Sequence, residues 1–172
     1  MNQLQKLQHK IVSLATAKTI CNTWKEEGKS VVFTNGCFDI LHKGHVSYLA
    51  QAAATGDCLV VGLNSDASVK RQGKGEERPI NDEDARAFVL AGLSFVDLIV
   101  IFDEDTPLQL IKELSPSVLV KGADYDANEE DETAKTYIVG SKEVKQNQGT
   151  VTTIPLEQGY STTNIVNRMK DR

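Results

Sequence analysis

The sequence has few cysteines and no long apolar run. Its 172 residues include three cysteines, Cys21, Cys37 and Cys58, and none of them forms a CxxC pair or another metal-site spacing. An odd number of cysteines without a signal sequence indicates a reducing compartment, so we expect a cytoplasmic protein. No stretch approaches the roughly 20 apolar residues that a membrane-spanning helix requires, and we expect no membrane partner.

Positive charge is also scarce. The chain has 19 Lys and Arg against 24 Asp and Glu, which gives a formal net charge of −5. A nucleic-acid-binding surface needs a basic stripe, so we expect no nucleic-acid partner. Any phosphorylated ligand must therefore be bound by a few local groups. The length suits one domain with a substantial core.

Short apolar runs that alternate with helical patterns predict an α/β fold. Buried strands are predicted over residues 30–35, 57–64, 96–102, 118–120 and 150–154. These runs are continuously apolar, which is typical of a parallel sheet covered on both faces. We expect a single Rossmann-like domain with a five-stranded, mostly parallel sheet in the order 3-2-1-4-5 and helices on both faces.

The segments between these strands have helical or loop character. Helices are predicted over 45–54, 82–93, 141–147 and 161–169, and another begins at Thr106-Pro107 with Thr106 as its cap. The basic segment 66–80 and the acidic segment 126–132 are predicted to be flexible loops.

The N-terminal segment has apolar residues at helical spacing over 2–27, and Gly28 ends the pattern. We therefore divide the chain into an N-terminal helical segment, 1–28, and a second part, 29–172. The apolar face of the segment suits either cover of the sheet or a subunit interface. A homodimer is expected, because two-fold homodimers are the commonest oligomers.

The most informative segment is TNGCFDILHKGH, residues 34–45. A strand ends here, the chain turns at Gly36 and a helix begins near Gly44. Because a helix N-terminus has free N–H groups and partial positive charge, this site suits an anion. His42 and His45, three residues apart, can face one ligand and donate hydrogen bonds to phosphate oxygens. Gly44 lets the backbone approach the phosphates.

Two histidines also suit an ordinary surface or a metal site. A zinc site needs at least one more ligand, and Asp39 is close enough in sequence to leave this alternative open. We assign no protein side chain as a metal ligand.

The segment 34–45 resembles the HxGH signature of the cytidylyltransferase-like nucleotidyltransferase superfamily. Residues 120–125, VKGADY, and 159–163, GYSTT, are similar to D-glycero-β-D-manno-heptose 1-phosphate adenylyltransferases. The resemblance extends from about residue 29 to 170. It implies transfer of a nucleotidyl group from a nucleoside triphosphate, with Mg²⁺ bound by the ATP, to a phosphate acceptor and release of pyrophosphate.

Three groups of candidate site residues result. The catalytic residues are His42, His45 and Lys121. The nucleotide-binding residues are Thr34, Asn35, Gly36, Phe38, Gly44, Asn64, Ser161, Thr162 and Thr163. The substrate-binding residues are Asp39, Arg78 and Arg86.

Several of these residues also have a simpler interpretation. Lys121 could be a solvated lysine at a strand end, and Ser161 has a structural task as a helix cap. Arg86 could pair with Asp82 on its own helix. Lys43 has two interpretations, extra positive charge or no role, and Cys37 is expected to pack in the turn.

The predicted reaction uses ATP and D-glycero-β-D-manno-heptose 1-phosphate and gives ADP-heptose for lipopolysaccharide or surface-layer glycan synthesis. Glycerol-3-phosphate cytidylyltransferases resemble the segment 34–45 too, but they carry an arginine before the serine-threonine pair. Residues 156–160, LEQGY, lack it, which favours the adenylyltransferase. A separate sugar kinase is expected to act upstream. A catalytically silent nucleotide-binding module is the remote alternative.

Overall fold

The computed structural model describes residues 1–73, 75 and 77–170, and its centre is a five-stranded sheet. The strands are β1 (Val31–Gly36), β2 (Cys58–Asn64), β3 (Leu98–Phe102), β4 (Val118–Gly122) and β5 (Thr150–Ile154). All neighbouring strands pair in parallel, in the order β3-β2-β1-β4-β5. The predicted α/β fold and strand order are confirmed.

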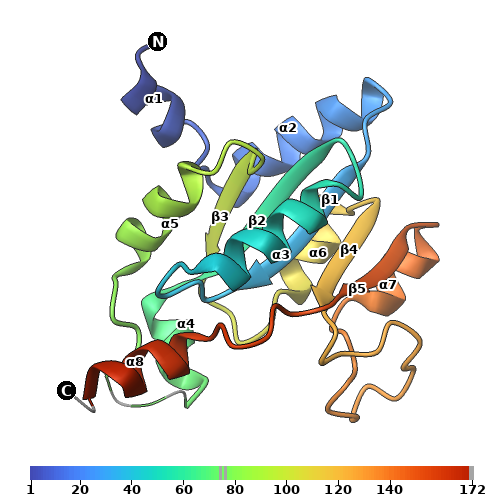
Figure 1. Ribbon diagram of the computed structural model, residues 1–172. Helices are drawn as coiled ribbons and strands as arrows, with labels where there is room; N and C mark the ends of the chain where they lie inside the picture. Colours follow the sequence, from blue (N-terminus) through green and yellow to red (C-terminus); the bar gives the residue numbers. More distant parts are fainter. Residues whose placement is uncertain (74, 76, 171–172) are drawn as a thin grey trace.

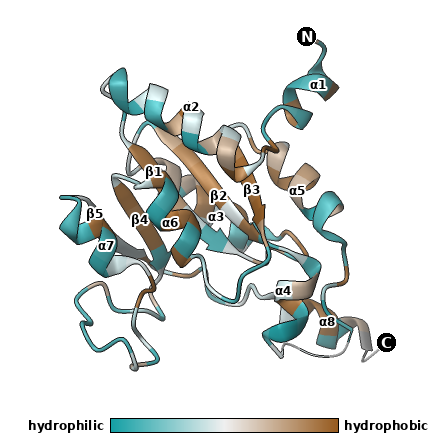
Figure 2. Ribbon diagram, turned by 180° about the vertical axis from the view of Figure 1, so that it is seen from behind, coloured by the Kyte–Doolittle hydropathy of each residue, from teal (hydrophilic) through white to brown (hydrophobic). Residues whose placement is uncertain are grey.

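Helices cover both faces of the sheet (Figure 1). On one face, α3 (Lys43–Ala53) and α5 (Glu83–Ala91) pack against side chains such as Val32 and Val61. On the other face, α2 (Leu14–Glu26), α6 (Leu108–Leu114) and α7 (Ser141–Gln146) pack against side chains such as Phe33. Figure 2 shows the strands as the apolar centre of the molecule. Continuous apolar runs form these strands because each face of the sheet is buried.

The predicted N-terminal helix is wrong in one respect, because it is broken in two. The helix α1 (Gln3–Gln8) ends before a short extended segment, and α2 begins after its cap, Ser13. The extended segment pairs with the edge of β3: Ile99 N–H donates to Lys10 O at 2.7 Å, and Val12 N–H donates to Ile99 O at 3.0 Å. Satisfying this open edge outweighs helix continuity.

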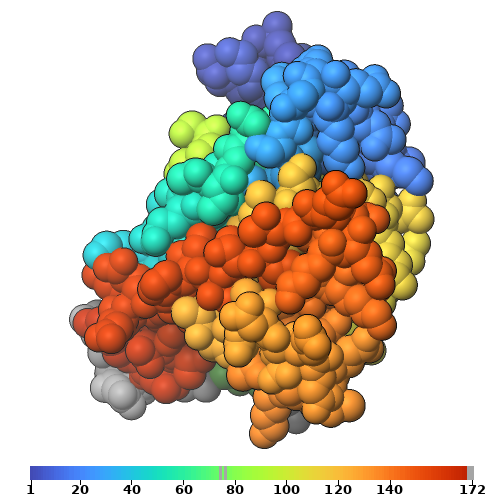
Figure 3. Space-filling view, turned by 90° about the vertical axis from the view of Figure 1, so that its right-hand side faces the viewer, coloured from blue at the N-terminus to red at the C-terminus, as the bar shows by residue number. Residues whose placement is uncertain are grey.

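Helix α2 packs into the core on one face of the sheet, because its Ala17 and Cys21 are completely buried. In contrast, α1 buries no residue and lies at the end of the molecule opposite α8 (Figure 3). The division of the chain at residue 28 stays a proposal.

The predicted loop 66–80 contains a helix, α4 (Asp66–Arg71). Ser65 caps it, because Ser68 N–H donates to Ser65 Oγ at 3.0 Å, and Val69 is buried beneath it. Two apolar side chains were too few to reveal this helix in the sequence. Positions 74 and 76 of the predicted loop lie outside the described residues.

The remaining helix boundaries agree closely with expectation, apart from one cap. Asp82 caps α5, and Ser161 caps α8 (Thr162–Lys170), whose Asn164 N–H donates to Ser161 Oγ. Thr106 does not cap α6, which begins one residue later than predicted with Pro107 at the cap position. Within the described part of the chain, no helix is long and apolar enough to cross a membrane.

Candidate active site at the carboxyl edge of the sheet

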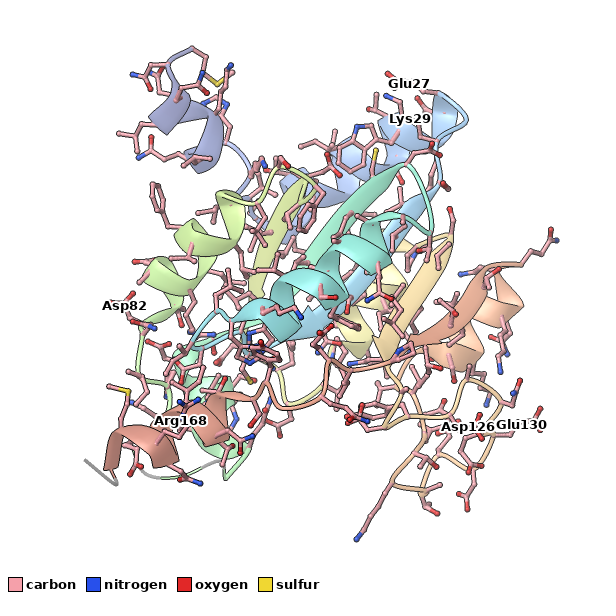
Figure 4. The ribbon with its side chains drawn as sticks, viewed as in Figure 1. Glu27, Lys29, Asp82, Asp126, Glu130 and Arg168 are labelled. Atoms are coloured by element: carbon pink, nitrogen blue, oxygen red, sulfur yellow. The ribbon has the colours of Figure 1, made fainter. Side chains whose placement is uncertain are left out.

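A cavity of about 680 Å³ lies at the edge where the parallel strands end. Figure 4 shows the two ends of the sheet. Glu27 and Lys29 lie at the end where β1 begins, whereas Asp126, Glu130 and Arg168 lie on segments near the edge where the strands end. Ligands of open parallel sheets bind at this edge, where the crossovers diverge from the central strands. The cavity is lined by Asn35, Gly36, Cys37, Phe38, His42, Gly44, His45, Tyr48, Asn64, Gln72, Asp105, Thr106, Lys121, Gly122, Asp124, Tyr125, Val139, Leu156, Glu157, Tyr160, Ser161 and Thr162.

The two histidines stand at the start of α3. His42 occupies the N-cap, and its Nδ1 accepts a hydrogen bond from His45 N–H at 3.3 Å. The two rings stack with centroids 3.8 Å apart, and Phe38 contacts the ring of His45 edge-on at 5.2 Å. The loop before them is strained at Phe38, whose φ is +44°. Both imidazoles are therefore held in place at the N-terminus of α3, the end of a helix that attracts anions.

The hydrogen bond to His42 determines its tautomer. Because Nδ1 accepts a hydrogen bond from the His45 backbone N–H, neutral His42 carries its proton on Nε2 and can donate a hydrogen bond from there to a ligand. Burial lowers the pKa of His42. The ring is thus a neutral hydrogen-bond donor near pH 7.

Lys121 brings a positive charge to the centre of the cavity. It lies at the end of β4 and donates to Asn35 Oδ1, at the end of the neighbouring β1, at 2.5 Å. Its ammonium also lies 5.5 Å from the centroid of the Tyr125 ring. These contacts hold the charge in the cavity that the two histidines also line, so the site has cationic and neutral donors together.

Tyr48 supports this centre from below. Its hydroxyl donates to Val120 O at 3.1 Å and contacts Thr34 Oγ1 at 2.7 Å, so it joins α3 to β4 and β1. Burial raises the pKa of Tyr48 to about 12, which keeps the phenol protonated. Thr34, predicted to bind nucleotide, is completely buried in this network and does not line the cavity.

The segment between β5 and α8 closes one side of the cavity. Glu157 accepts from Lys43 Nζ at 2.5 Å, and Lys43 lies 5.2 Å from the Tyr160 ring. Gly44 makes room for this segment, because an added Cβ would come within 3.1 Å of both the His42 ring and Tyr160 Cβ. The glycine of the motif therefore serves close packing against the C-terminal segment.

Two predicted substrate-binding residues lie behind the motif instead of in the cavity. Asp39 is 3% exposed, and its carboxylate accepts from Arg78 Nε at 2.5 Å and from the backbone N–H groups of Ile80 and Asn81 at 2.9 Å. This network fastens the loop before α3 to the segment that leads into α5. Asp39 and Arg78 therefore hold the loop before α3 in position.

Arg86 has a similar position. It is 2% exposed and donates to the carbonyl oxygens of Cys37 and Asn64, at 2.7 and 2.8 Å, and to Asp66 Oδ1 at 2.7 Å. Its guanidinium pairs with the Asp66 carboxylate and not with that of Asp82, the partner that its spacing suggested. Arg86 thus joins the ends of β1 and β2.

The structure brings together most of the predicted cluster. The residues that line the cavity are His42, His45, Lys121, Asn35, Gly36, Phe38, Gly44, Asn64, Ser161 and Thr162. Those that do not line it are Thr34, Thr163, Asp39, Arg78 and Arg86. Sequence reasoning missed Tyr48, Gln72, Asp105, Thr106 and Glu157, which come from helices and loops with no motif of their own.

Metal binding by the protein alone was left open at His42, His45 and Asp39. Asp39 is fully engaged behind the loop, and the described part of the chain contains no group of three His, Cys, Asp or Glu side chains placed for a metal ion.

Comparison with known proteins identifies the family. Residues 33–168 match the family described as Cytidylyltransferase-like. The chain belongs to this family. This cytidylyltransferase-like chain is 56% identical over 164 residues to the bifunctional protein HldE of Campylobacter concisus. The aligned residues are 95% of this chain and 32% of that protein. It is 53% identical over 151 residues to HldE of Helicobacter pylori, or 88% of the chain and 30% of that protein.

The cytidylyltransferase-like chain therefore spans about a third of the length of these relatives. Among solved structures it is similar to the lipopolysaccharide core biosynthesis protein from Thermoplasma volcanium, with a TM-score of 0.57 and 27% identity over 78% of this chain and all of that one. A pantoate-beta-alanine ligase from Francisella tularensis shares the fold alone, at 14% identity over 94% of this chain and 78% of the other and a TM-score of 0.59.

Proposed function

We propose that this chain is an adenylyltransferase that converts D-glycero-β-D-manno-heptose 1-phosphate and ATP to ADP-heptose and pyrophosphate. The observation that carries the proposal is the stacked pair His42 and His45, at the start of α3 and in one cavity with Lys121. The heptose phosphate is supported by the motifs at 120–125 and 159–163 and by the bifunctional relatives.

The reaction needs no general base. A phosphate oxygen of the sugar phosphate, already an anion, attacks the α-phosphorus of ATP and forms a new P–O bond. The bond between the α-phosphorus and the bridging oxygen breaks, and that oxygen keeps the electron pair and leaves with pyrophosphate. Protein groups have to position two polyanions and offset the charge that builds up on the α-phosphate.

The described side chains supply these tasks. His42 donates through Nε2 to an α-phosphate oxygen, and His45 stands beside it. Lys121 offsets the negative charge where the two substrates meet. Backbone N–H groups at the start of α8, next to Ser161 and Thr162, receive the leaving phosphates. One such donor contributes roughly 3–4 kcal/mol to transition-state stabilisation.

Mg²⁺ belongs to the nucleotide in this proposal. Asp105, Asp124 and Glu157 line the cavity, but in the described part of the chain no three His, Cys, Asp or Glu side chains are grouped to hold a metal ion. Triphosphate oxygens and water would hold the ion, which neutralises charge on the phosphates when bound.

The remaining expectations are part of the proposal. The reaction takes place in the cytoplasm, consistent with three buried cysteines that form no disulfide in the described part of the chain. We also propose a homodimer, and a sugar kinase activity that supplies the heptose 1-phosphate, a role consistent with the bifunctional relatives.

Pyrophosphate release tests the reaction. The chain is incubated with Mg²⁺ and either ATP or CTP, each with heptose 1-phosphate or glycerol 3-phosphate. We expect turnover with ATP and heptose 1-phosphate; turnover with CTP alone would contradict the proposal. His42→Ala and His45→Ala should each lower kcat by about 100-fold or more while circular dichroism stays unchanged. Unchanged turnover in both variants would contradict the role proposed for the histidines, and no turnover of the wild type with any of the four substrate pairs would favour a silent binding module.

A further inference from the structure

Helix α5 carries apolar side chains on both of its faces. The inner face packs against the sheet through Ala87 and Leu90, which are completely buried. On the outer face, Phe88 is 37% exposed and Val89 is 52% exposed. A surface helix normally carries polar or charged residues on the side away from the core, so these two side chains indicate a second contact.

The apolar surface continues at both ends of α5. Beyond the C-terminal end lies α1, where Lys10 Nζ donates to Leu93 O at 2.9 Å and Leu4 is 54% exposed (Figure 1). Before the N-terminal end Ile80 is half exposed, and a hollow of about 190 Å³ lies between α5 and the loop 38–41. The apolar strip so formed consists of Leu4, Phe88, Val89 and Ile80.

The two ends of the apolar strip carry opposite charges. Lys6 lies in the last turn of α1, and no acidic residue comes before Glu26 in the chain. The first turn of α5 contains Glu83 and Asp84, and Figure 4 shows the neighbouring Asp82 at the end of α5 away from α1. Lys6 and Asp84 are both exposed, and neither takes part in an ion pair within the described residues.

We propose that the apolar strip is the interface of a two-fold homodimer, in which α5 of each copy packs against α5 and α1 of the other. The inference rests on the proposed function only for the homodimer, and the reaction has no part in it. A surface with a positive end, an apolar middle and a negative end is complementary to itself after a half-turn, as a two-fold interface requires. The half-turn brings Lys6 of each copy to Asp84 of the other.

A second copy also gives α1 a surface to pack on. A helix of six residues is marginal in water, because the cost of nucleation is shared by very few hydrogen bonds. Leu7 packs partly against the core, and Leu4 lies three residues earlier on the same face of α1. In the dimer Leu4 meets the hollow beside Val89 of the other copy, because α1 arrives at the acidic end of that α5.

Sedimentation equilibrium of the whole chain measures the dimer directly. The mass should approach twice the 18.9 kDa of one chain, with a Kd at or below about 10 µM. Phe88→Ser, which removes an apolar anchor from the centre of the strip, should raise this Kd about 30-fold or more. A wild type that stays monomeric up to about 100 µM, or a dimer that keeps its Kd in Phe88→Ser, would overturn the inference.

Reversed charges test whether the occupant is a second copy in this arrangement. Lys6→Glu and Asp84→Lys should each raise the Kd about tenfold or more, because each variant brings like charges together twice. An equimolar mixture of the two variants should form a heterodimer with nearly the wild-type Kd, since both contacts then join opposite charges. Lys135→Glu and Glu130→Lys, which reverse exposed charges in the loop after β4, are the matched controls and should not change the Kd.

The mixture and the enzyme assay separate the two ideas. No recovery of the dimer in the mixture, while circular dichroism shows both variants folded, would overturn the two-fold arrangement. Pyrophosphate release is measured on the same samples. A wild-type dimer without turnover of ATP and heptose 1-phosphate would contradict the proposed reaction and support the interface, whereas turnover by a monomer would support the reaction and overturn the interface.

Discussion

At the scale of single residues, the buried arginine of α5 shows how the site is held in shape. Arg86 makes four hydrogen bonds to groups on three segments, including the carbonyl oxygens that end β1 and β2. Only a planar guanidinium can reach all of these acceptors at once. The residue therefore fixes how the loop after β1 lies relative to the end of β2 and the start of α4.

Replacing Arg86 by lysine should lower the free energy of unfolding by about 1–3 kcal/mol, because a compact ammonium leaves buried carbonyl oxygens without donors. Urea unfolding followed by circular dichroism measures the change. Arg71→Lys, at an exposed arginine, is the control and should have little effect. Unchanged stability together with a raised KM for the sugar phosphate would instead restore Arg86 to substrate binding, as the sequence had suggested.

The pKa of His42 gives stability a predictable dependence on pH. Burial lowers this pKa in the folded state, so the unfolded chain binds more protons between the folded value and the ordinary value of 6.5. His42 therefore makes the protein lose stability as pH falls from about 7 through this window. His42→Asn keeps a good helix cap and removes the titration. Between pH 7 and pH 5 the free energy of unfolding of the wild type should fall more than that of His42→Asn. A difference between the two proteins that stays constant over this range would contradict the lowered pKa of His42.

At the scale of elements, α3 and the segment that leads to α8 form one side of the site together. Their contacts are Lys43 with Glu157, Ser47 with Glu157 at 3.5 Å, and Lys43 with the ring of Tyr160. The ion pair is exposed, and exposed pairs contribute little to global stability. Their effect is local: they set where the start of α8 lies relative to the histidines.

Glu157→Gln should loosen this segment without unfolding the core. We expect faster protease cleavage within residues 155–161 and a higher KM for ATP, while the melting temperature stays nearly constant. Glu113→Gln breaks the exposed pair with Lys18 on the other face and should change neither property. A marked fall in melting temperature in Glu157→Gln would show that the contact supports the whole fold.

The sequence predicted the elements well where the pattern was long and apolar. The central strands β2 and β3 followed from continuous apolar runs, whose burial leaves little choice of conformation. The strand order came from the doubly wound fold that the alternation of strands and helices indicates, and the structure confirms it. Sequence reasoning failed where a distant contact decided the outcome. The break in the N-terminal helix depends on the open edge of β3, and α4 depends on Ser65 and one buried valine.

The same holds for the site. The histidines, Lys121 and Ser161 were found because they sit in motifs or at strand and helix ends. Arg86 and Asp39 were assigned to substrate because a charged side chain in a sequence pattern gives no sign of its burial. Gln72 and Thr106 carry no pattern at all, and only the strand order places them beside the motif.

At the scale of the whole molecule, the core and the site are concentrated in the sheet and its covering helices. The first helix, α1, buries no residue, although Leu7 packs partly against the core. Deleting residues 1–8 should therefore lower the melting temperature by less than about 4 °C and leave kcat unchanged. Calorimetry measures the shift, and Ala17→Asp, which puts a charge into the core, serves as a destabilised control. Loss of a cooperative transition in the deletion would show that α1 belongs to the folding unit.

In the proposed reaction His42 both caps α3 and presents Nε2 to the phosphates, so evolution can lose one task and keep the other. A lineage that no longer needs catalysis still needs its helix, and replacements at this position are then restricted to other capping residues, such as Asn, Ser, Asp or Thr. His45 does not cap, and the restriction at its position comes from packing against the rings of His42 and Phe38. A homologue with a capping residue in place of the first histidine and a non-imidazole side chain in place of the second is therefore expected to have kept the fold and abandoned the reaction.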